Sequence, residues 1–165
     1  MIEIRVLLPG DDRSSFSSGE ESLDRYFRRY AGQNQFRHRI GTNYIAISDG
    51  RIAGYTTVSA AHIEAEKLPA AIARRLPAYP LPVLRLARLA TASVDRGRGI
   101  GEALLRYVLL LARQMSREYG CVGVVADAKL GAEAFYARYG FQALEVTDET
   151  EGQIPMFLPL GGIPE

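Results

Sequence analysis

The chain has 165 residues, of which 47% are hydrophobic and 24% charged, values typical of one globular domain over residues 1–165. No stretch approaches the roughly 20 apolar residues of a membrane-spanning helix, and the charged residues soon after Met1 argue against a secretory signal peptide. A net charge of +1 gives the whole chain no strong attraction for polyanions. The single cysteine, Cys121, excludes an internal disulfide and is compatible with a reducing cytoplasm.

A strand and then a helix are the first elements predicted along the chain. Apolar and polar residues alternate over Ile2–Val6, as in a half-buried strand. A helix is predicted from about Glu20 to Ala31, because apolar residues recur at helical spacing from Leu23 to Tyr30. Ser18 and Glu21 have the spacing of a capping box, which would begin this helix.

Arginines cluster on the other face of this helix and shortly after it. They are Arg25, Arg28, Arg29 and the run Arg37-His38-Arg39. A solvated helix face and a nucleic-acid contact both explain such a pattern.

A β-hairpin is predicted next. Asn43–Ser48 and Ile52–Ser59 flank Asp49-Gly50, a pair of residues that favours the positive φ angles of a two-residue turn. A short helix is then expected over Leu68–Leu76, before a proline-rich stretch that favours extended structure.

Strands and helices alternate in the second half of the chain. The predicted elements are a strand at Val83–Ala92, a helix from near Glu102 to about Tyr119, a strand at Cys121–Ala126, a helix at Ala132–Tyr139 ended by Gly140, and strands at Gln142–Val146 and Pro155–Leu160. This order predicts an α+β domain (an α/β three-layer arrangement) around a central mixed sheet.

A glycine-rich turn, Arg96-Gly97-Arg98-Gly99-Ile100-Gly101, joins a predicted strand to a predicted helix. Alternate glycines remove the Cβ atoms that would keep a pyrophosphate from the backbone, and the next helix offers unpaired N–H groups and the positive end of its dipole. The two arginines add positive charge. A Rossmann fingerprint would need glycine where Glu102 stands, and no P-loop Gly-Lys-Ser/Thr occurs. The alternative is a turn that merely caps the helix.

This turn resembles the acyl-CoA-binding segment of the GNAT superfamily of N-acetyltransferases, Arg/Gln-x-x-Gly-x-Gly/Ala. Further along, Phe135–Phe141 resembles the family's Phe-Tyr-x-x-x-Gly-Phe segment. The resemblance implies the GNAT fold, a largely antiparallel sheet splayed between its fourth and fifth strands. It also implies acetyl-CoA as acetyl donor, no metal and a possible homodimer. The cofactor-binding residues it implies are Leu89, Ala90, Thr91, Arg96, Gly97, Arg98, Gly99, Ile100 and Gly101.

Tyr136 is the catalytic residue that the resemblance implies. In the family this tyrosine lies near the thioester sulfur, and a phenol with an ordinary pKa near 10 can protonate the departing thiolate. Taken alone, Tyr136 is better explained as a half-buried core aromatic, and the family resemblance is what favours the catalytic role. The strand before the turn departs from the family at Thr91 and Ala92, where a hydrophobic and an acidic residue are common.

No general base can be assigned from the sequence. Glu21, Asp127 and His62 have suitable chemistry, but each also fits a structural role. An amine whose pKa is lowered by the site, or one that loses its proton to water, needs no dedicated base.

A narrower resemblance is to the GNAT toxins of bacterial toxin–antitoxin pairs. It rests on Phe16–Gly19, Leu23–Phe27, Gly54-Tyr55 and Arg88-Leu89-Ala90, in order ahead of the turn. The cysteine that usually precedes the first helix is Ser18 here. The resemblance implies aminoacyl-tRNA as acetyl acceptor and a ribbon-helix-helix antitoxin as partner. Other hypotheses are an acetyltransferase of a small amine or of a protein or peptide amine, a non-catalytic acyl-CoA-binding module, and a purely structural turn.

Overall fold

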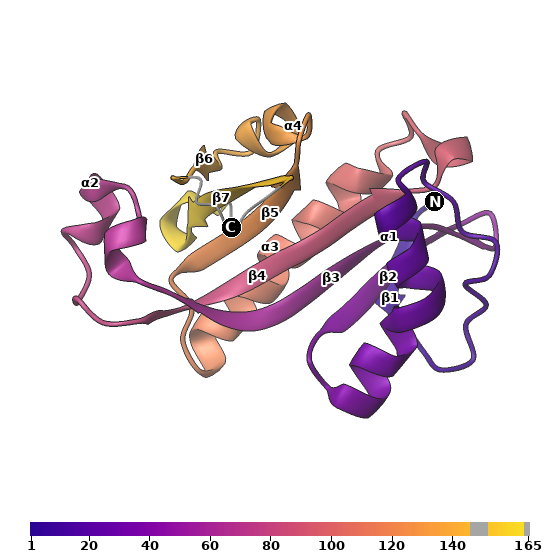
Figure 1. The fold of residues 1–165 in the computed structure, drawn as a ribbon, viewed down its shortest axis with the longest axis horizontal. Helices are drawn as coiled ribbons and strands as arrows, with labels where there is room; N and C mark the ends of the chain where they lie inside the picture. Colours follow the sequence, from indigo (N-terminus) through magenta and orange to yellow (C-terminus); the bar gives the residue numbers. More distant parts are fainter. Residues whose placement is uncertain (146–151, 164–165) are drawn as a thin grey trace. The chain divides into compact units, whose positions relative to one another are not determined.

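The computed structural model describes residues 1–145 and 152–163. The chain forms two compact units: a first unit of Met1–Ser59 with Ala87–Val108, and a second unit of Ala60–Leu86 with Leu109–Glu165. Two strands and one helix begin in one unit and end in the other (Figure 1): β3 (Arg51–Ile63), β4 (Leu81–Thr91) and α3 (Ile100–Glu118).

The described strands have the order β1-β2-β3-β4-β5-β7-β6 in a mixed sheet. The pairs β1–β2, β2–β3, β5–β7 and β6–β7 are antiparallel, whereas β4 and β5 are parallel. The parallel pairing covers Leu84–Leu86 opposite Val124–Ala126. This arrangement, with helices between the strands, confirms the predicted α+β fold class.

The first unit begins with the predicted strand and contains the predicted hairpin. The predicted strand is β1 (Glu3–Val6), and the hairpin consists of β2 (Thr42–Ser48) and β3. The helix α1 (Glu21–Arg25) lies between β1 and β2 in the chain. Asp49 and Gly50 have φ angles of 54° and 76°, and Ser48 pairs with Arg51 across the turn. Both turn residues are therefore left-handed, as a two-residue hairpin with this twist requires.

The first helical segment is longer than predicted and begins differently. After α1 it continues through π-helical turns at Tyr26–Tyr30 and Gln33–His38, beyond the predicted end at Ala31.

The predicted capping box is wrong. The Ser18 hydroxyl donates to Asp24 Oδ1 (2.6 Å) and its backbone N–H also donates to that carboxylate, because the buried Asp24 needs donors.

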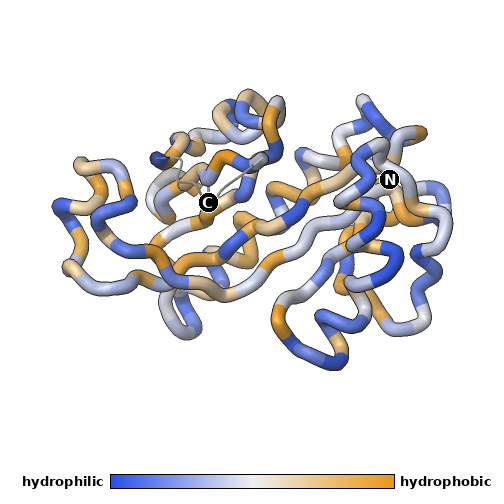
Figure 2. Tube along the Cα trace, viewed as in Figure 1, coloured by the Kyte–Doolittle hydropathy of each residue, from blue (hydrophilic) through white to orange (hydrophobic). Residues whose placement is uncertain are grey.

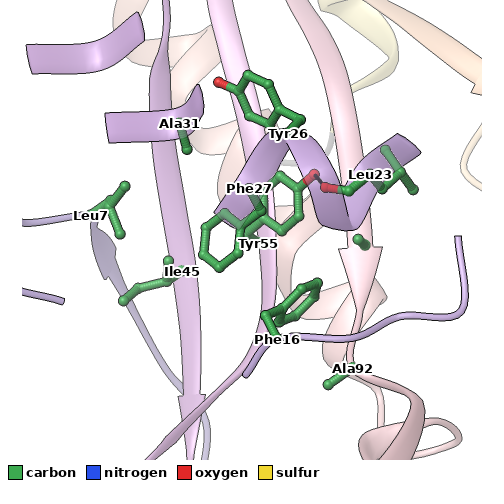
Figure 3. Packing of buried hydrophobic residues seen from close by; sticks show 10 residues of the cluster. Leu7, Phe16, Leu23, Tyr26, Phe27, Ala31, Ile45, Tyr55 and Ala92 are labelled. Carbon is green, nitrogen blue, oxygen red and sulfur yellow. Dashed lines mark hydrogen bonds between the residues drawn. The ribbon is translucent and has the colours of Figure 1, made fainter. Parts of the chain in front are cut away.

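An aromatic cluster forms the core of the first unit (Figure 3). The rings of Phe27 and Tyr55 stack at 4.2 Å between centroids, and Phe16 meets both edge-on. The Tyr55 hydroxyl donates to the Leu23 carbonyl at 2.7 Å, which satisfies its polar end. Tyr30, predicted for the same helix face, is instead 41% exposed because the π-helical turns change the helical spacing.

The second unit contains the remaining elements. They are α2 (Ala70–Ala73), β5 (Gly123–Lys129), α4 (Glu133–Ala137), β6 (Gln142–Ala143) and β7 (Gln153–Pro159). Cys121 precedes β5 rather than lying in the predicted strand, and it is buried, with its thiol donating to the Gly123 carbonyl. The end of the predicted strand Gln142–Val146 lies outside the described residues.

Candidate active site

The glycine turn leaves β4 and enters α3 within the first unit. Gly97 and Gly99 have φ angles of 78° and 79°, and a Cβ added at either would meet no atom within 4 Å. Among the described residues, the backbone N–H groups of 97–101 donate to no other backbone carbonyl. The turn therefore presents open space lined by unpaired donors at the start of a helix, the arrangement that binds anions.

Gly54 on β3 allows α3 to begin close to the sheet. A Cβ at this position would lie 2.7 Å from Ile100 Cγ2 and 2.8 Å from the Ala90 carbonyl oxygen. Ile100 is buried with Leu104 against alanines of β2 and β3, and Leu89 packs against the same cluster. This close packing sets the height of the first turn of α3 above β4.

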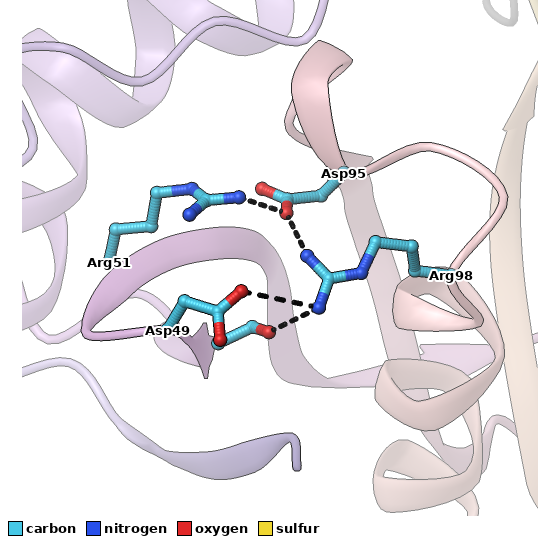
Figure 4. Close-up of polar contacts among 5 residues, drawn as sticks. Asp49, Arg51, Asp95 and Arg98 are labelled. Carbon is cyan, nitrogen blue, oxygen red and sulfur yellow. Dashed lines mark hydrogen bonds and ion pairs between the residues drawn. The ribbon is translucent and has the colours of Figure 1, made fainter.

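Asp95 is a fully buried carboxylate directly before the turn (Figure 4). Its Oδ1 accepts from Arg51 Nη2 at 2.5 Å and from Arg98 Nη1 at 2.8 Å. Its Oδ2 is buried and forms no hydrogen bond with any described residue. Asp95 is not predicted as a site residue from the sequence, where its only signal is an acidic residue close to Arg96 and Arg98.

The arginines of the turn are held by protein acceptors. Arg98 bonds to Asp95 and also reaches Ser48 Oγ (3.2 Å) and Asp49 Oδ2 (3.4 Å), which links the turn to the hairpin. The Arg96 guanidinium donates to the Ser18 carbonyl. Both arginine side chains therefore hold the turn in place. The sequence had suggested them only as sources of positive charge.

Tyr136 lies on α4 in the second unit, with 4% of its surface exposed. Its ring meets Phe135 and Phe141 edge-on, at centroid distances of 5.2 and 5.4 Å. Burial, and secondarily the negative charge of Asp127, raise the pKa of the Tyr136 phenol well above its ordinary value. The side chain is therefore a protonated phenol throughout the neutral range.

The three candidate bases have different surroundings. Asp127 accepts from Arg85 Nη2 at 2.5 Å and Nε at 2.7 Å, so its carboxylate is ion-paired. His62 is exposed at the rim of a cavity of about 400 Å³ in the second unit, which Arg85 also lines. Glu21 is exposed at the start of α1. The geometry singles out none of them as a base.

The first unit has a larger cavity, of about 560 Å³. Arg51, Phe16 and Ser93 are among its lining residues, and it lies beside the segment that leads into the glycine turn.

Among the described residues, no helix is long and apolar enough to cross a membrane. The same residues include no cluster of three or more His, Cys, Asp or Glu side chains that could hold a metal ion.

Comparison with known families gives a match to the acetyltransferase (GNAT) domain over residues 39–143, which includes the glycine turn and Tyr136. The chain belongs to the GNAT acetyltransferase family. It is therefore an acetyltransferase, and the fold that its motifs predicted is that of its family.

Other GNAT proteins resemble the chain over most of its length. A tRNA-acetylating toxin of Mycobacterium tuberculosis is 33% identical over 141 residues, covering 84% of this chain and 82% of the toxin. The structure of AtaT with acetyl-methionyl-tRNAfMet is 24% identical, with a TM-score of 0.87, and covers 99% and 97% of the two chains. A tyrosine-to-phenylalanine mutant of AtaT, bound to the C-terminus of the antitoxin AtaR and acetyl-CoA, is 23% identical with a TM-score of 0.79, covering 98% and 95%.

Proposed function

We propose that this GNAT acetyltransferase acetylates the amino group of aminoacyl-tRNA, using acetyl-CoA, and acts as the toxin of a toxin–antitoxin pair. The observation that carries the proposal is the 33% identity, over 84% of the chain, to a tRNA-acetylating toxin. The acetyl-CoA and antitoxin bound in a structure of AtaT support the same cosubstrate and kind of partner. Charged tRNA and acetyl-CoA are cytoplasmic, so we place the activity there.

The glycine turn fits the pyrophosphate of acetyl-CoA. The open space at Gly97 and Gly99, and the unpaired N–H groups that follow, supply donors where a phosphate oxygen would need them. The backbone of Leu89, Ala90 and Thr91 would hold the pantetheine arm and polarise the acetyl carbonyl. Acetyl-CoA, when bound, supplies the acetyl group as a thioester.

Tyr136 is proposed as the general acid. Attack by the amine on the thioester carbon forms the C–N bond, the C–S bond then breaks, and the phenol proton passes to the departing sulfur. The attacking nitrogen gives up its own proton to water, and a proton from solvent restores the phenol. Burial raises the pKa of this phenol above the ordinary value assumed from the sequence, so the phenol stays protonated but is a weaker acid than a free tyrosine. The role is supported by the place of Tyr136 in the segment that resembles the family's Phe-Tyr-x-x-x-Gly-Phe, within the matched GNAT domain. We assign no base, since the Asp127 carboxylate is already paired with Arg85.

Acetyl transfer from radiolabelled acetyl-CoA tests the proposed function directly. We expect label to enter bulk aminoacyl-tRNA, and not deacylated tRNA or a panel of small amines and peptides. Label only on an amine or peptide would contradict the tRNA proposal and favour an acetyltransferase of that acceptor. Binding of acetyl-CoA without transfer to any acceptor would favour a non-catalytic module.

Gly99→Ala is expected to weaken acetyl-CoA binding about tenfold, because alanine at a φ of 79° costs roughly 1–2 kcal/mol and the turn relaxes to avoid it. Thermal unfolding with and without acetyl-CoA measures this loss, since a ligand at 100 times its Kd stabilises by about 2.7 kcal/mol. The matched control is Gly50→Ala, which has a φ of 76° and equally open surroundings. Equal acetyl-CoA affinity in the two variants would remove the turn from the binding site.

A further inference from the structure

Positive charge is concentrated in one continuous segment of the first unit. Residues 25–48 contain five arginines and His38 but no aspartate or glutamate. Because the whole chain carries a net charge of +1, the remaining residues carry a net charge of −4. A polyanion would therefore be attracted to this segment and repelled by the rest of the chain.

Four of these arginines are exposed: Arg25, Arg29, Arg37 and Arg39. None of them takes part in the ion pairs found among the described residues, which neutralise arginines such as Arg51 and Arg98. Figure 2 shows strongly hydrophilic stretches along the helical segment that carries them. Their guanidinium groups are free to form the two-pronged hydrogen bonds that phosphate accepts.

Arg28 has a different role from its neighbours. It is half-buried, and its Nη1 donates to the Phe16 carbonyl at 2.7 Å. It therefore ties the helical segment to the chain that precedes α1. The exposed arginines are the ones available to a partner.

The exposed arginines stand on a rigid support. The amide of Asn43, on β2, is fully buried and accepts from the Tyr26 hydroxyl (3.1 Å) and the Thr57 hydroxyl (2.7 Å). Its Nδ2 donates to the Ala31 carbonyl (3.2 Å) and to Gln35 Oε1 (3.0 Å). These hydrogen bonds attach the helical segment to the sheet of the first unit. The backbone that carries the exposed arginines is therefore held in place.

Exposed apolar groups accompany the arginines. Tyr30 is 41% exposed and follows Arg29 directly, and Ile40 is 63% exposed and follows Arg39. An exposed aromatic ring beside arginines can stack on an unpaired base. This segment therefore offers a nucleic acid both charge for its phosphates and an aromatic ring for its bases.

We propose that Arg25, Arg29, Arg37 and Arg39 bind the sugar–phosphate backbone of the RNA acceptor. This inference rests on the proposed function, in which the acceptor is a charged tRNA. It accounts for how a chain with a net charge of +1 can hold a polyanion. Phosphate contacts position the RNA without reading its sequence, so the surface serves affinity rather than isoacceptor choice.

Two double variants, Arg25→Gln/Arg29→Gln and Arg37→Gln/Arg39→Gln, test the surface. The matched control is Arg74→Gln/Arg75→Gln, which removes the same charge from exposed arginines of the second unit. We expect each test variant to raise the KM for aminoacyl-tRNA about tenfold with kcat unchanged. The slope of log KM against log salt should fall by about 1.4–1.8, since each lost phosphate contact changes it by about 0.7–0.9. Arg→Lys versions should keep the salt slope.

Three results would overturn the inference. They are an unchanged KM in the test variants, an equal change in the control, and an equal change with an aminoacyl-adenosine acceptor that lacks the tRNA body. Direct binding of deacylated tRNA, measured without acetyl-CoA, separates this inference from the proposed function. If the wild type acetylates no charged tRNA yet binds tRNA through these arginines, the proposed function is contradicted and the tRNA-binding role of the arginines is supported. If the wild type binds no tRNA, that binding role is contradicted.

Discussion

Tyr136→Phe is expected to lower kcat about 100-fold or more while leaving acetyl-CoA affinity unchanged. General acid catalysis contributes typically 10²–10⁴-fold, and phenylalanine keeps the ring while removing the proton that the departing thiolate would take. The Tyr136 ring packs edge-on against Phe135 and Phe141, so the variant retains its packing. Steady-state kinetics with aminoacyl-tRNA, beside calorimetric binding of acetyl-CoA, separates the two effects.

A second buried tyrosine provides the control for this variant. Burial also raises the pKa of Tyr55, and its hydroxyl donates to a backbone carbonyl in the aromatic core. Tyr55→Phe should lower stability by about 1 kcal/mol and leave kcat unchanged. An unchanged kcat in Tyr136→Phe would contradict the role of Tyr136 as the acid.

The pH profile gives an independent check on Tyr136. Its raised pKa means that the acid form persists as the pH passes 10, where an ordinary tyrosine loses its proton. The wild type should therefore show no fall in kcat centred near pH 10. A fall at that pH, absent from Tyr136→Phe, would show that the phenol titrates normally.

Gly54→Ala is expected to be the most damaging of the glycine substitutions near the turn. The added Cβ would lie 2.7 Å from Ile100 Cγ2 and 2.8 Å from the Ala90 carbonyl oxygen, closer than real Cβ atoms approach their neighbours. The start of α3 must move away from β3 and the β4 backbone at Ala90 must shift as well, and overpacking of this kind costs about 1–3 kcal/mol. The displaced first turn of α3 should also lose acetyl-CoA affinity, because its N–H groups shift with it.

Denaturant unfolding and acetyl-CoA titration together measure this effect. Gly123→Ala is the control, since its Cβ would lie 2.3 Å from the Leu158 carbonyl oxygen in the second unit. That variant should lose stability without losing acetyl-CoA affinity under conditions in which it is folded. Wild-type affinity in a destabilised Gly54→Ala variant would show that the turn does not depend on this packing.

Local sequence signals predicted the elements that local forces decide. Asp49-Gly50 formed the expected turn because both residues tolerate positive φ. Gly97 and Gly99 marked the turn before α3 for the same reason, and the helical period of residues 104–115 predicted the long helix itself. The motifs around Gly99 and Tyr136 were enough to identify the family.

Contacts between distant residues decided the rest. The sequence could not show that Ser18 would bond to a buried Asp24 instead of capping the helix, or that Arg96 would reach the Ser18 carbonyl. Nor could it show that Arg51, far along the chain, would meet Asp95. Local propensity depends on neighbours in the chain, whereas the burial of a charge depends on which strands and helices come together. The sequence alone thus determined the turn, the long helix and the family, and only the tertiary structure decided how the turn is held and which arginines remain exposed.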